Sequence, residues 1–286
     1  MTFSIPGFDL DAFMVAVLTE DLGGAPGAGG HDLTSETTIP ADAIFTGVME
    51  SRQAMMMAGL PIAAAFFQSL DPTAEVDLLV ADGDAVTRGT ELLHLKGNAR
   101  AMLSAERSAL NTVQHLTGIA TLTHSYVQQL EGTGAILLDT RKTTPGLRLL
   151  EKYATRVGGA SNYRLGLWDA VMIKDNHLAV AQSVGQAVGA VRATGVTRIV
   201  VEVDHIDQIE PAIAAGATHL LLDNMKPDVL RRAVSLVGGR VPTEASGGVQ
   251  LDNIREIAET GVTYVSVGRL TQSAPAADIG VDFTAV

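Results

Sequence analysis

The sequence predicts an α/β protein whose C-terminal part is a TIM-like barrel of parallel strands. Short apolar runs alternate in this part with amphipathic stretches of helical length. Hairpin signals are missing between the runs, and strands that are connected through helices run parallel. Charged residues or glycines follow each apolar run directly, as in a barrel whose strand ends carry its site.

The repeating pattern begins after residue 130. Its predicted strands are 135–138, 170–173, 199–203, 219–222, a weaker one at 241–245, and 264–267. Its predicted helices are 146–157, 180–194, 206–215, 226–237 and 250–260. A run of strand–helix steps of this kind favours a single parallel sheet.

The first part of the chain has a different rhythm. Helices are predicted at 9–20, 60–70 and 100–130, the last one broken at Gly118. Alternating apolar residues between 76 and 95 predict two strands around an Asp82-Gly83 turn, and the methionines at 55–57 are expected in the core. The change of rhythm places a domain boundary near residue 114, between an N-terminal domain (1–113) and the barrel (114–273).

Two motifs in the first part are interpreted as structural. The stretch GGAPGAGG at 23–30 lacks the Gly-Lys-Ser/Thr ending of a phosphate-binding P-loop and is expected to be a loop. Residues 76–95 are superficially similar to a biotinyl or lipoyl carrier. A carrier displays a lysine at a hairpin tip, whereas Lys96 lies beyond the second strand, so this reading is disfavoured.

Composition excludes several classes of function. The 286 residues are 47% hydrophobic and have a net charge of -12 and no cysteine, so disulfides, a thiolate nucleophile and a zinc–thiolate site are excluded. An acidic chain with 4% aromatic residues argues against a nucleic-acid partner. No apolar run approaches the roughly 20 residues of a membrane span, and the N-terminus lacks the basic region of a signal peptide. We expect no membrane association and a cytoplasmic location.

The charged residues at the strand ends point to an anionic substrate. Four cations suit carboxylates or phosphates: Arg141, Lys142, Arg164 and Lys174. In an acidic protein they indicate a small, strongly anionic substrate. Glu202 and Asp223 are isolated carboxylates that could hold Mg²⁺ together with substrate phosphates, or face developing positive charge.

The last two loops are rich in glycine. Ser246, Gly247 and Gly248 follow one strand and Gly268 follows the next, where barrels often bind phosphate through backbone N–H groups. His177 could be an acid or base, or a loop histidine that completes hydrogen bonds. The sequence does not decide between these two.

Other polar and aromatic residues are given structural interpretations. His205 and His219 lack metal-ligand spacing. Trp168 is expected to pack in the interior. Three cations at helical spacing are expected to form a face that is solvated or meets another subunit: Arg148, Lys152 and Arg156.

Motifs along nearly the whole chain are similar to those of one family. They include LTEDL from 18, HDLT from 31, AERSALN from 105, GIAT from 118, DTRKTTPGLR from 139, KDNH from 174, VEV from 201, LDNM from 222 and EASGG from 244. By these motifs the chain resembles quinolinate phosphoribosyltransferases, the carboxylating nicotinate-nucleotide pyrophosphorylases. The combination of DTRKT, PG and KDNH in this order is specific.

The resemblance implies both a fold and a reaction. The fold would be an open α/β barrel with an N-terminal α/β sandwich domain, onto which the tail 274–286 packs back. The assembly would be a homodimer, or a higher assembly of dimers, with Arg107 contributed across the interface. The enzyme would be a pentosyltransferase that uses Mg²⁺. It would join quinolinate to 5-phosphoribosyl-1-pyrophosphate (PRPP) and release nicotinate mononucleotide, pyrophosphate and CO₂ in NAD biosynthesis.

The same resemblance suggests roles for the site residues. Arg141, Arg164 and Lys174, with the partner's Arg107, would bind the two carboxylates of quinolinate, and Lys142 and the glycine loops would bind phosphates. The expected catalytic residues are Lys142, Glu202 and Asp223, and Glu202 and Asp223 are the expected metal ligands. His177 and Tyr163 complete the expected substrate site.

One position departs from the family pattern. Asn162-Tyr163-Arg164 stands where the family usually has Asn-His-Arg. Tyrosine stays neutral where histidine can be charged, so Tyr163 is either a tolerated variant or a sign of altered substrate preference. His31, where the family often has glycine, is interpreted as a loop detail.

Two other functions are weighed against this one. A paralogous phosphoribosyltransferase of the molybdate-uptake-associated type would act on another aromatic acid, but the KDNH segment argues against it. A non-catalytic barrel that binds a phosphorylated ligand through the SGG segment would not need Lys142 and Glu202 together.

Overall fold

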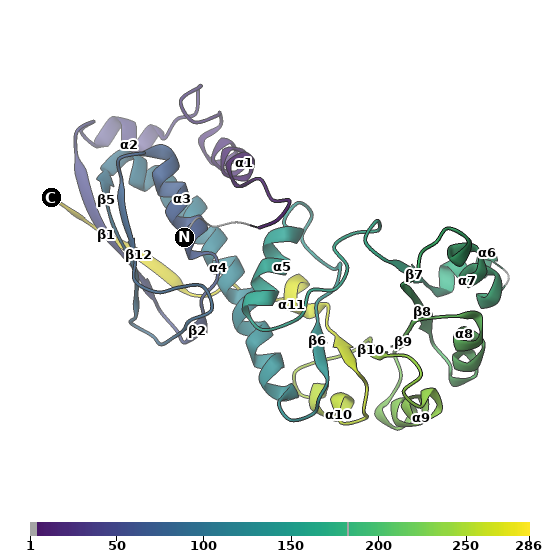
Figure 1. Cartoon of the computed structure of the whole chain (residues 1–286). Coiled ribbons are helices and arrows are strands. Elements are labelled where there is room, and N and C mark those ends of the chain that lie inside the picture. Colours follow the sequence, from purple (N-terminus) through teal and green to yellow (C-terminus); the bar gives the residue numbers. More distant parts are fainter. Residues whose placement is uncertain (1–4, 182) are drawn as a thin grey trace. The chain divides into compact units, whose positions relative to one another are not determined.

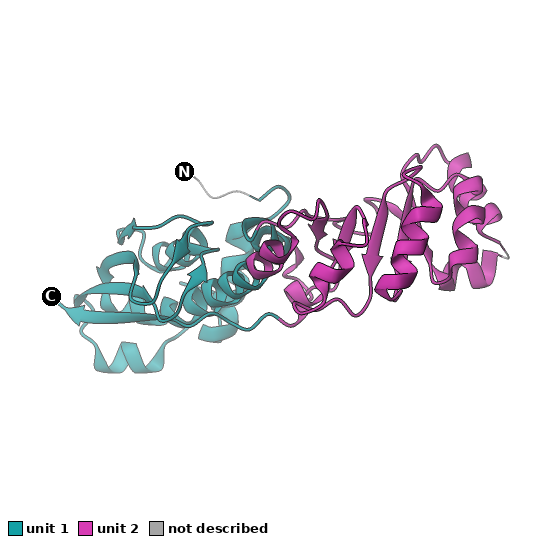
Figure 2. Cartoon of the chain, turned by 90° about the horizontal axis from the view of Figure 1, so that it is seen from below, with its two compact units in different colours: residues 1–122, 149–158, 274–286 teal, residues 123–148, 159–273 magenta. Residues whose placement is uncertain are grey.

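The computed structural model describes residues 5–181 and 183–286, and these form two compact units (Figure 2). Unit 1 comprises Met1–Leu122, Leu149–Gly158 and Ala274–Val286, and unit 2 comprises Thr123–Arg148 and Gly159–Ser273. The expected boundary near residue 114 falls inside one helix, α4 (Ala99–Leu130), which passes from the first unit into the second. The tail 274–286 belongs to unit 1, as the resemblance implies.

Unit 1 is built on a four-stranded antiparallel sheet in the order β12-β1-β5-β3. Its strands are β1 (Ile44–Ser51), β3 (Glu75–Leu78), β5 (Glu91–Asn98) and β12 (Ile279–Ala285). Unit 1 also contains a separate two-stranded sheet, formed by β2 (Met55–Met56) and β4 (Ala85–Val86). The sequence does not predict β1 or β12, because the two strands pair with each other across most of the chain length.

Helices complete unit 1: α1 (Leu10–Leu22), α2 (Leu33–Thr38), α3 (Leu60–Leu70), the first part of α4, and most of α5 (Arg148–Val157). The expected α3 is confirmed with its predicted bounds. It begins after Gly59, which has a positive φ of 91°, and it buries Phe66 and Phe67 completely. Met55, Met56 and Met57 are buried, so the predicted core role of these methionines is also confirmed.

Gly118 does not break α4, which runs through it without interruption, so this prediction is wrong. The reason is a close approach of another segment. A Cβ placed on Gly118 would lie 2.0 Å from the carbonyl oxygen of Pro275. The backbone N–H of Ala277 donates to the carbonyl of Gln114 on the same helix. Glycine is therefore required here so that the C-terminal segment can lie directly against the helix.

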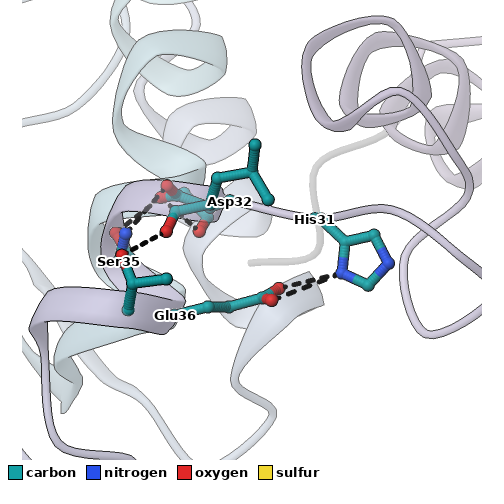
Figure 3. Close-up of polar contacts among 7 residues, drawn as sticks. His31, Asp32, Ser35 and Glu36 are labelled. Carbon is teal, nitrogen blue, oxygen red and sulfur yellow. Dashed lines mark hydrogen bonds and ion pairs between the residues drawn. The ribbon is translucent and has the colours of Figure 1, made fainter.

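Asp32 joins α2 to α4 (Figure 3). It is the N-cap of α2, and its carboxylate accepts hydrogen bonds from the N–H of Ser35 at 3.0 Å and the hydroxyl of Ser35 at 2.5 Å. The hydroxyl of Ser104, on α4, donates to the same carboxylate at 3.0 Å. Burial raises the pKa of Asp32, but these hydrogen bonds outweigh burial, and the pKa lies below its ordinary value.

Asp32→Ala is expected to lower the free energy of unfolding by about 1–2 kcal/mol at pH 7, because an N-cap is lost. A carboxylate with a depressed folded-state pKa stabilises the fold above its unfolded pKa, and this contribution disappears as the pH falls through the folded-state value. The difference between wild type and variant should therefore shrink below about pH 4. Urea unfolding at pH 7, 4 and 3 measures it.

His31→Ala is the matched control for this prediction. His31 contacts Glu36 at 3.2 Å, but the two side chains are 61% and 42% exposed. Exposed ion pairs contribute little, so the change should stay within about 0.5 kcal/mol. A difference for Asp32→Ala that is the same at pH 7 and pH 3 would contradict the assigned role of the carboxylate.

Unit 2 contains one six-stranded parallel sheet in the order β6-β11-β10-β9-β8-β7 (Figure 1). The strands are β6 (Ile136–Leu138), β7 (Val171–Ile173), β8 (Ile199–Val203), β9 (His219–Asp223), β10 (Thr243–Ser246) and β11 (Tyr264–Ser266). The last strand pairs with the first, as in a closed barrel, whereas β6 and β7 are the two edges of the described sheet. The barrel is open between these two strands, and the predicted fold class is confirmed.

The helices of unit 2 follow the strands in turn: α6 (Asp175–Ala181), α7 (Val184–Ala193), α8 (Ile209–Ala215) after a short 3₁₀ turn (Ile206–Gln208), α9 (Pro227–Val237), α10 (Ile254–Ala258) and α11 (Arg269–Gln272). The helix predicted at 180–194 corresponds to α7, which Ser183 caps, and α6 is additional. Figure 1 shows α7 to α10 in sequence along the outside of the sheet. No described helix combines the length and apolar character needed to cross a bilayer.

Two structural interpretations are wrong. Lys152 is 1% exposed, so this residue is not part of a solvated face, whereas Arg156 on the same helix is exposed. Glu151, next to Lys152, is fully buried beside His115 at 2.9 Å. Trp168 is 80% exposed and does not pack in the interior. Arg148 has a local role, because it donates to the hydroxyl of Thr143 and the carbonyl of Leu165.

Candidate active site

One cavity of about 700 Å³ lies at the carboxyl ends of the six strands of unit 2. Each strand, or the loop directly after it, contributes to the lining. Most of the predicted site residues line it: Arg141, Lys142, Tyr163, Arg164, Lys174, Glu202, Asp223, Ser246, Gly247, Gly248 and Gly268. The polar strand ends therefore meet at one site, as the pattern in the sequence predicts.

The period of two along each strand explains this convergence. On β10, Glu244 and Ser246 share a face, and both line the cavity. Leu221 and Asp223 do the same on the neighbouring β9, where Ser246 is paired with Asp223 in the register. Gly268, which follows β11, also lines the cavity.

Lys174 and Glu202 form an ion pair inside the cavity. The ammonium of Lys174, after β7, donates to the carboxylate of Glu202 on β8. The lysine side chain is 42% exposed and the glutamate side chain 9%, so the lysine keeps a solvent-facing side for a ligand. Two neighbouring strands are thus joined at their carboxyl ends.

The surroundings of Asp223 disfavour the ionised form of its carboxyl group. Burial, followed by the nearby charge of Asp204, raises the pKa of Asp223 above its ordinary value, and Lys174 and Lys142 oppose this shift. The side chain of Asn224 donates to the Asp223 carboxylate at 2.5 Å. A cation or a developing positive charge at this position would relieve the destabilised carboxylate.

Arg141 and Arg164, two of the arginines that line the cavity, are prepared for an anion. The Nε atom of Arg141 is buried and has no acceptor among the residues that the structure describes. Arg164 donates to the carbonyl of Ala170 at 3.1 Å. Burial, and then the positive charge of Arg141, lower the pKa of Arg164. An anion between the two guanidinium groups would supply the missing acceptor and reduce their repulsion.

Lys142 lies against the backbone of Gly268. A Cβ placed on Gly268 would lie 2.6 Å from Cδ of Lys142, so any larger residue would displace the lysine. The hydroxyl of Thr271 donates to the carbonyl of Lys142 at 2.6 Å, and the N–H of Lys142 donates to Thr140 at 3.0 Å. The lysine backbone is therefore held at both ends by hydroxyl groups.

The loop after β10 exposes backbone N–H groups. Gly247 and Gly248 have positive φ angles of 88° and 63°. A Cβ on Gly247 would lie 2.1 Å from the side-chain oxygen of Asn224, which itself has a positive φ of 54° and donates from its N–H to the carbonyl of Ser246. Successive N–H groups in such a turn form an anion-binding concavity.

Asp139 positions the segment that carries Tyr163 and Arg164. This segment follows no strand of the sheet, yet it reaches the cavity. Asp139 follows β6 and is fully buried, and its carboxylate accepts from the N–H of Tyr163 at 2.7 Å and the side chain of Asn162 at 2.8 Å. A parallel bridge between Leu138 and Ser161 adds to this anchor at the open edge of the barrel. The sequence analysis assigns no role to Asp139.

Two predicted site residues do not line the cavity within the described structure. Arg107 lies on α4 in unit 1, and its side chain is 60% exposed. His177 is on α6, where Nδ1 accepts from the N–H of Lys174 at 3.0 Å. This contact corresponds to the second of the two interpretations, a histidine that completes hydrogen bonds next to a site residue.

The cavity is also lined by Glu244, Asn224 and Arg269, which are not among the predicted site residues. The signal for Glu244 is its place two residues before Ser246 on one strand, which puts both on the same face. For Arg269 the signal is its place directly after Gly268.

The donor set suits Mg²⁺ only with help from a substrate. No group of three His, Cys, Asp or Glu side chains in the described ranges could hold a metal ion. Glu202 and Asp223 are the two carboxylates at the mouth of β8 and β9. Mg²⁺ is commonly held by one or two carboxylates together with water and substrate phosphates, so these two residues fit that mode of binding.

Comparison with known proteins identifies the family. The C-terminal domain model of quinolinate phosphoribosyl transferase matches residues 119–282, and the N-terminal domain model matches 32–117. The chain is 41% identical over 258 residues to a probable nicotinate-nucleotide pyrophosphorylase [carboxylating] of Bacillus subtilis, covering 90% of this chain and 89% of that one. It is 38% identical to quinolinate phosphoribosyltransferase [decarboxylating] 2a, mitochondrial, of Nicotiana tabacum, covering 96% and 82%.

A solved structure agrees with these sequence matches. NadC from Streptococcus pyogenes superposes with a TM-score of 0.92 at 35% identity, covering 99% of each chain. With both domain models matched and relatives near 40% identity over most of its length, the chain belongs to the quinolinate phosphoribosyltransferase family.

Proposed function

We propose that this protein catalyses the decarboxylating transfer of a phosphoribosyl group from PRPP to quinolinate. The products are nicotinate mononucleotide, pyrophosphate and CO₂, and the reaction belongs to NAD biosynthesis. The observation that carries the proposal is the cavity of unit 2, where five cationic side chains and the N–H groups of a glycine loop face one space. A doubly charged acid and a polyphosphate donor together need such a site.

The acid lies between Arg141, Arg164 and Lys174. The free Nε of Arg141 and the closeness of the two guanidinium groups support this assignment. Lys142 and the backbone N–H groups of 247, 248 and 268 bind the phosphates of the donor, because the lysine lies directly on Gly268. The acid and the sugar are then held side by side, which converts their encounter into a reaction within one complex.

Charge stabilisation is the second contribution of the site. As pyrophosphate leaves, positive charge develops at the anomeric carbon of the ribose, and Glu202 and Asp223 face it. The same two carboxylates would hold Mg²⁺, which would supply positive charge against the pyrophosphate leaving group. No covalent intermediate is needed, in agreement with a chain that has no cysteine.

A product assay tests this function. The full-length protein with quinolinate, PRPP and Mg²⁺ should release nicotinate mononucleotide and CO₂ in equal amounts. Nicotinate and other aromatic acids are offered in parallel, because turnover of one of them without turnover of quinolinate would favour the paralogous transferase. Binding of PRPP without turnover of any acid would favour the non-catalytic barrel.

A cytoplasmic location stays a prediction.

Lys174→Ala is expected to raise the KM for quinolinate about tenfold while the KM for PRPP stays within about twofold. The reason is that Lys174 contributes a charge to the acid side of the cavity. Lys226→Ala is the matched control, since Lys226 is an exposed lysine that follows β9 of the same sheet and does not line the described cavity. An equal rise in the KM of both substrates would show that Lys174 does not act on the acid alone.

We further propose a homodimer, or an assembly of dimers, in which each site receives Arg107 from its partner. The guanidinium of Arg107 is 60% exposed and lies 3.9 Å from the carboxylate of Glu106, which supports this proposal. A third arginine would complete the binding of a doubly charged acid.

Mixing two inactive variants tests the shared site. Arg107→Ala and Lys142→Ala homodimers should each be inactive. After subunit exchange, one of the two sites in each heterodimer carries neither substitution, so about a quarter of the wild-type activity should return. Activity that stays absent although exchange has been shown by mass would place Arg107 in its own subunit's site or outside it.

A further inference from the structure

A buried polar cluster lies directly under the cavity. It consists of Tyr163, His219, Glu244 and Tyr264, and is called the floor cluster below. Tyr163 and Glu244 line the cavity. His219 is two residues before Leu221 on the same face of β9, and therefore deeper in the barrel than the strand ends. The interior of such a barrel is normally filled with branched apolar side chains, so a carboxylate here needs a partner.

His219 is that partner. Its Nε2 lies 3.0 Å from Oε2 of Glu244, and the two side chains are only 6% and 1% exposed. The imidazole ring is stacked on Tyr264, with ring centres 5.5 Å apart and an angle of 10° between the planes. Neither Nε2 of His219 nor Oε2 of Glu244 has a well-formed hydrogen bond within the described residues, so the pairing rests on their closeness and burial.

The pair is linked to Tyr163. The rings of Tyr163 and His219 are 6.2 Å apart, and the guanidinium of Arg198 lies 5.6 Å from the centre of the Tyr163 ring. Burial, and then the charge of Glu244, raise the pKa of Tyr163. Its buried hydroxyl has no well-formed hydrogen bond within the described residues. It therefore remains a protonated donor at the base of the acid side of the cavity.

Glu244 is the only one of these groups with the wrong charge for an anionic ligand. Its carboxylate lies on the lining, close enough to Arg164 to influence the titration of that arginine. Without a partner it would repel an anion above it and draw the arginine away from the ligand. The repulsion would be about twice as strong for a dianion as for a monoanion.

We propose that His219 is a positioning residue that sets the preference for a doubly charged acid. By pairing with Glu244 it cancels the negative charge under the cations and holds Tyr163 in place. Position 163, where the family usually has histidine, is tyrosine here, and the nearby imidazole is that of His219 on β9. Tyr163 is then a tolerated variant, which answers the question left open by the sequence. The inference rests on the proposed function only for the identity of the acid.

Two inert ligands test the charge dependence. Benzene-1,2-dicarboxylate and benzoate have no ring nitrogen to accept the phosphoribosyl group, so their binding can be measured by calorimetry without turnover. His219→Leu should weaken the dianion about tenfold and the monoanion about threefold, because the electrostatic free energy scales with ligand charge. Binding of PRPP should change by less than about twofold. Equal weakening of all three ligands, as expected from general loosening of the fold, would overturn the proposal.

A second substitution tests the route through Glu244. In the His219→Leu background, Glu244→Gln removes the uncompensated charge, and binding of the dianion should return to within about threefold of wild type. Failure to recover would overturn the proposal. His94→Leu is the matched control, because His94 pairs with Glu91 at 2.9 Å on the exposed surface of unit 1. It should change nothing.

Two measurements separate the possible failures. If His219→Leu does not fold, as judged by circular dichroism, His219→Gln replaces it, since it removes the imidazole and keeps a polar group of similar size. Turnover of quinolinate by the wild type reports separately on the proposed function. Wild-type turnover with no charge dependence in the variants leaves the function standing and refutes the role of His219.

Discussion

Lys142→Ala is expected to lower kcat by about 10²–10³ while the protein keeps its fold, because one preorganised cation is removed from the leaving phosphates. The lysine backbone is fixed by Thr140 and Thr271, and its side chain lies on Gly268. The ammonium is therefore placed before substrate arrives, and its removal should act on turnover more than on binding of the acid. Initial rates over a matrix of quinolinate and PRPP concentrations separate the two effects.

Lys96→Ala is the control for this prediction. Lys96 is 50% exposed on β5 of unit 1, where it pairs with Glu75 at 3.1 Å. Its loss removes the same charge without touching the cavity, so kcat should be unchanged. If both variants lost activity equally, the net charge of the protein would be responsible. A Lys142→Ala enzyme with normal kcat would remove the lysine from the catalytic residues.

Gly268→Ala offers a milder change at the same place. Gly268 has a φ of -72°, which alanine adopts without strain, so the only effect should come from the contact with the Lys142 side chain. Partial loss of kcat with unchanged thermal stability would show that the position of the lysine matters as well as its charge. The two variants together thus distinguish the presence of the ammonium from its placement.

Local sequence pattern was sufficient for unit 2. Each strand is a short apolar run or ends in polar residues, and Ile199–Val203 is buried along its whole length. A short apolar run of this kind can be recognised as a strand from the local sequence alone. The strand ends also carried the site, since charged residues that follow consecutive parallel strands are brought together by the sheet itself.

Distant pairing explains what the sequence does not predict. The strand Ile44–Ser51 alternates irregularly, and its partner begins at Ile279, so neither segment signals the sheet alone. The low helix propensity of glycine predicts a break at Gly118, but the helix requires glycine there because Pro275 lies directly against it. Glu244 and His219 lie inside strands, where an isolated polar residue gives no sign of its partner until the register is known.

Asp139→Ala is expected to lower the free energy of unfolding by about 1–3 kcal/mol, because it removes a fully buried carboxylate that accepts two hydrogen bonds. The donors are the N–H of Tyr163 and the side chain of Asn162, at 2.7 and 2.8 Å. The segment they anchor carries Arg164 into the cavity, so the KM for quinolinate should also rise about tenfold. Thermal unfolding and steady-state kinetics measure the two effects.

The matched control for this change is Asp169→Ala on the same segment. Asp169 accepts the N–H of Leu165 at 2.8 Å, but it is exposed, so water can replace it and little stability should be lost. Asp139→Asn keeps the size of the side chain and one acceptor oxygen, and should retain the fold while raising the KM for quinolinate. If Asp139→Asn lost stability but kept its KM, the anchor would serve the barrel edge alone, and the placement of Arg164 would depend on its own contact with Ala170.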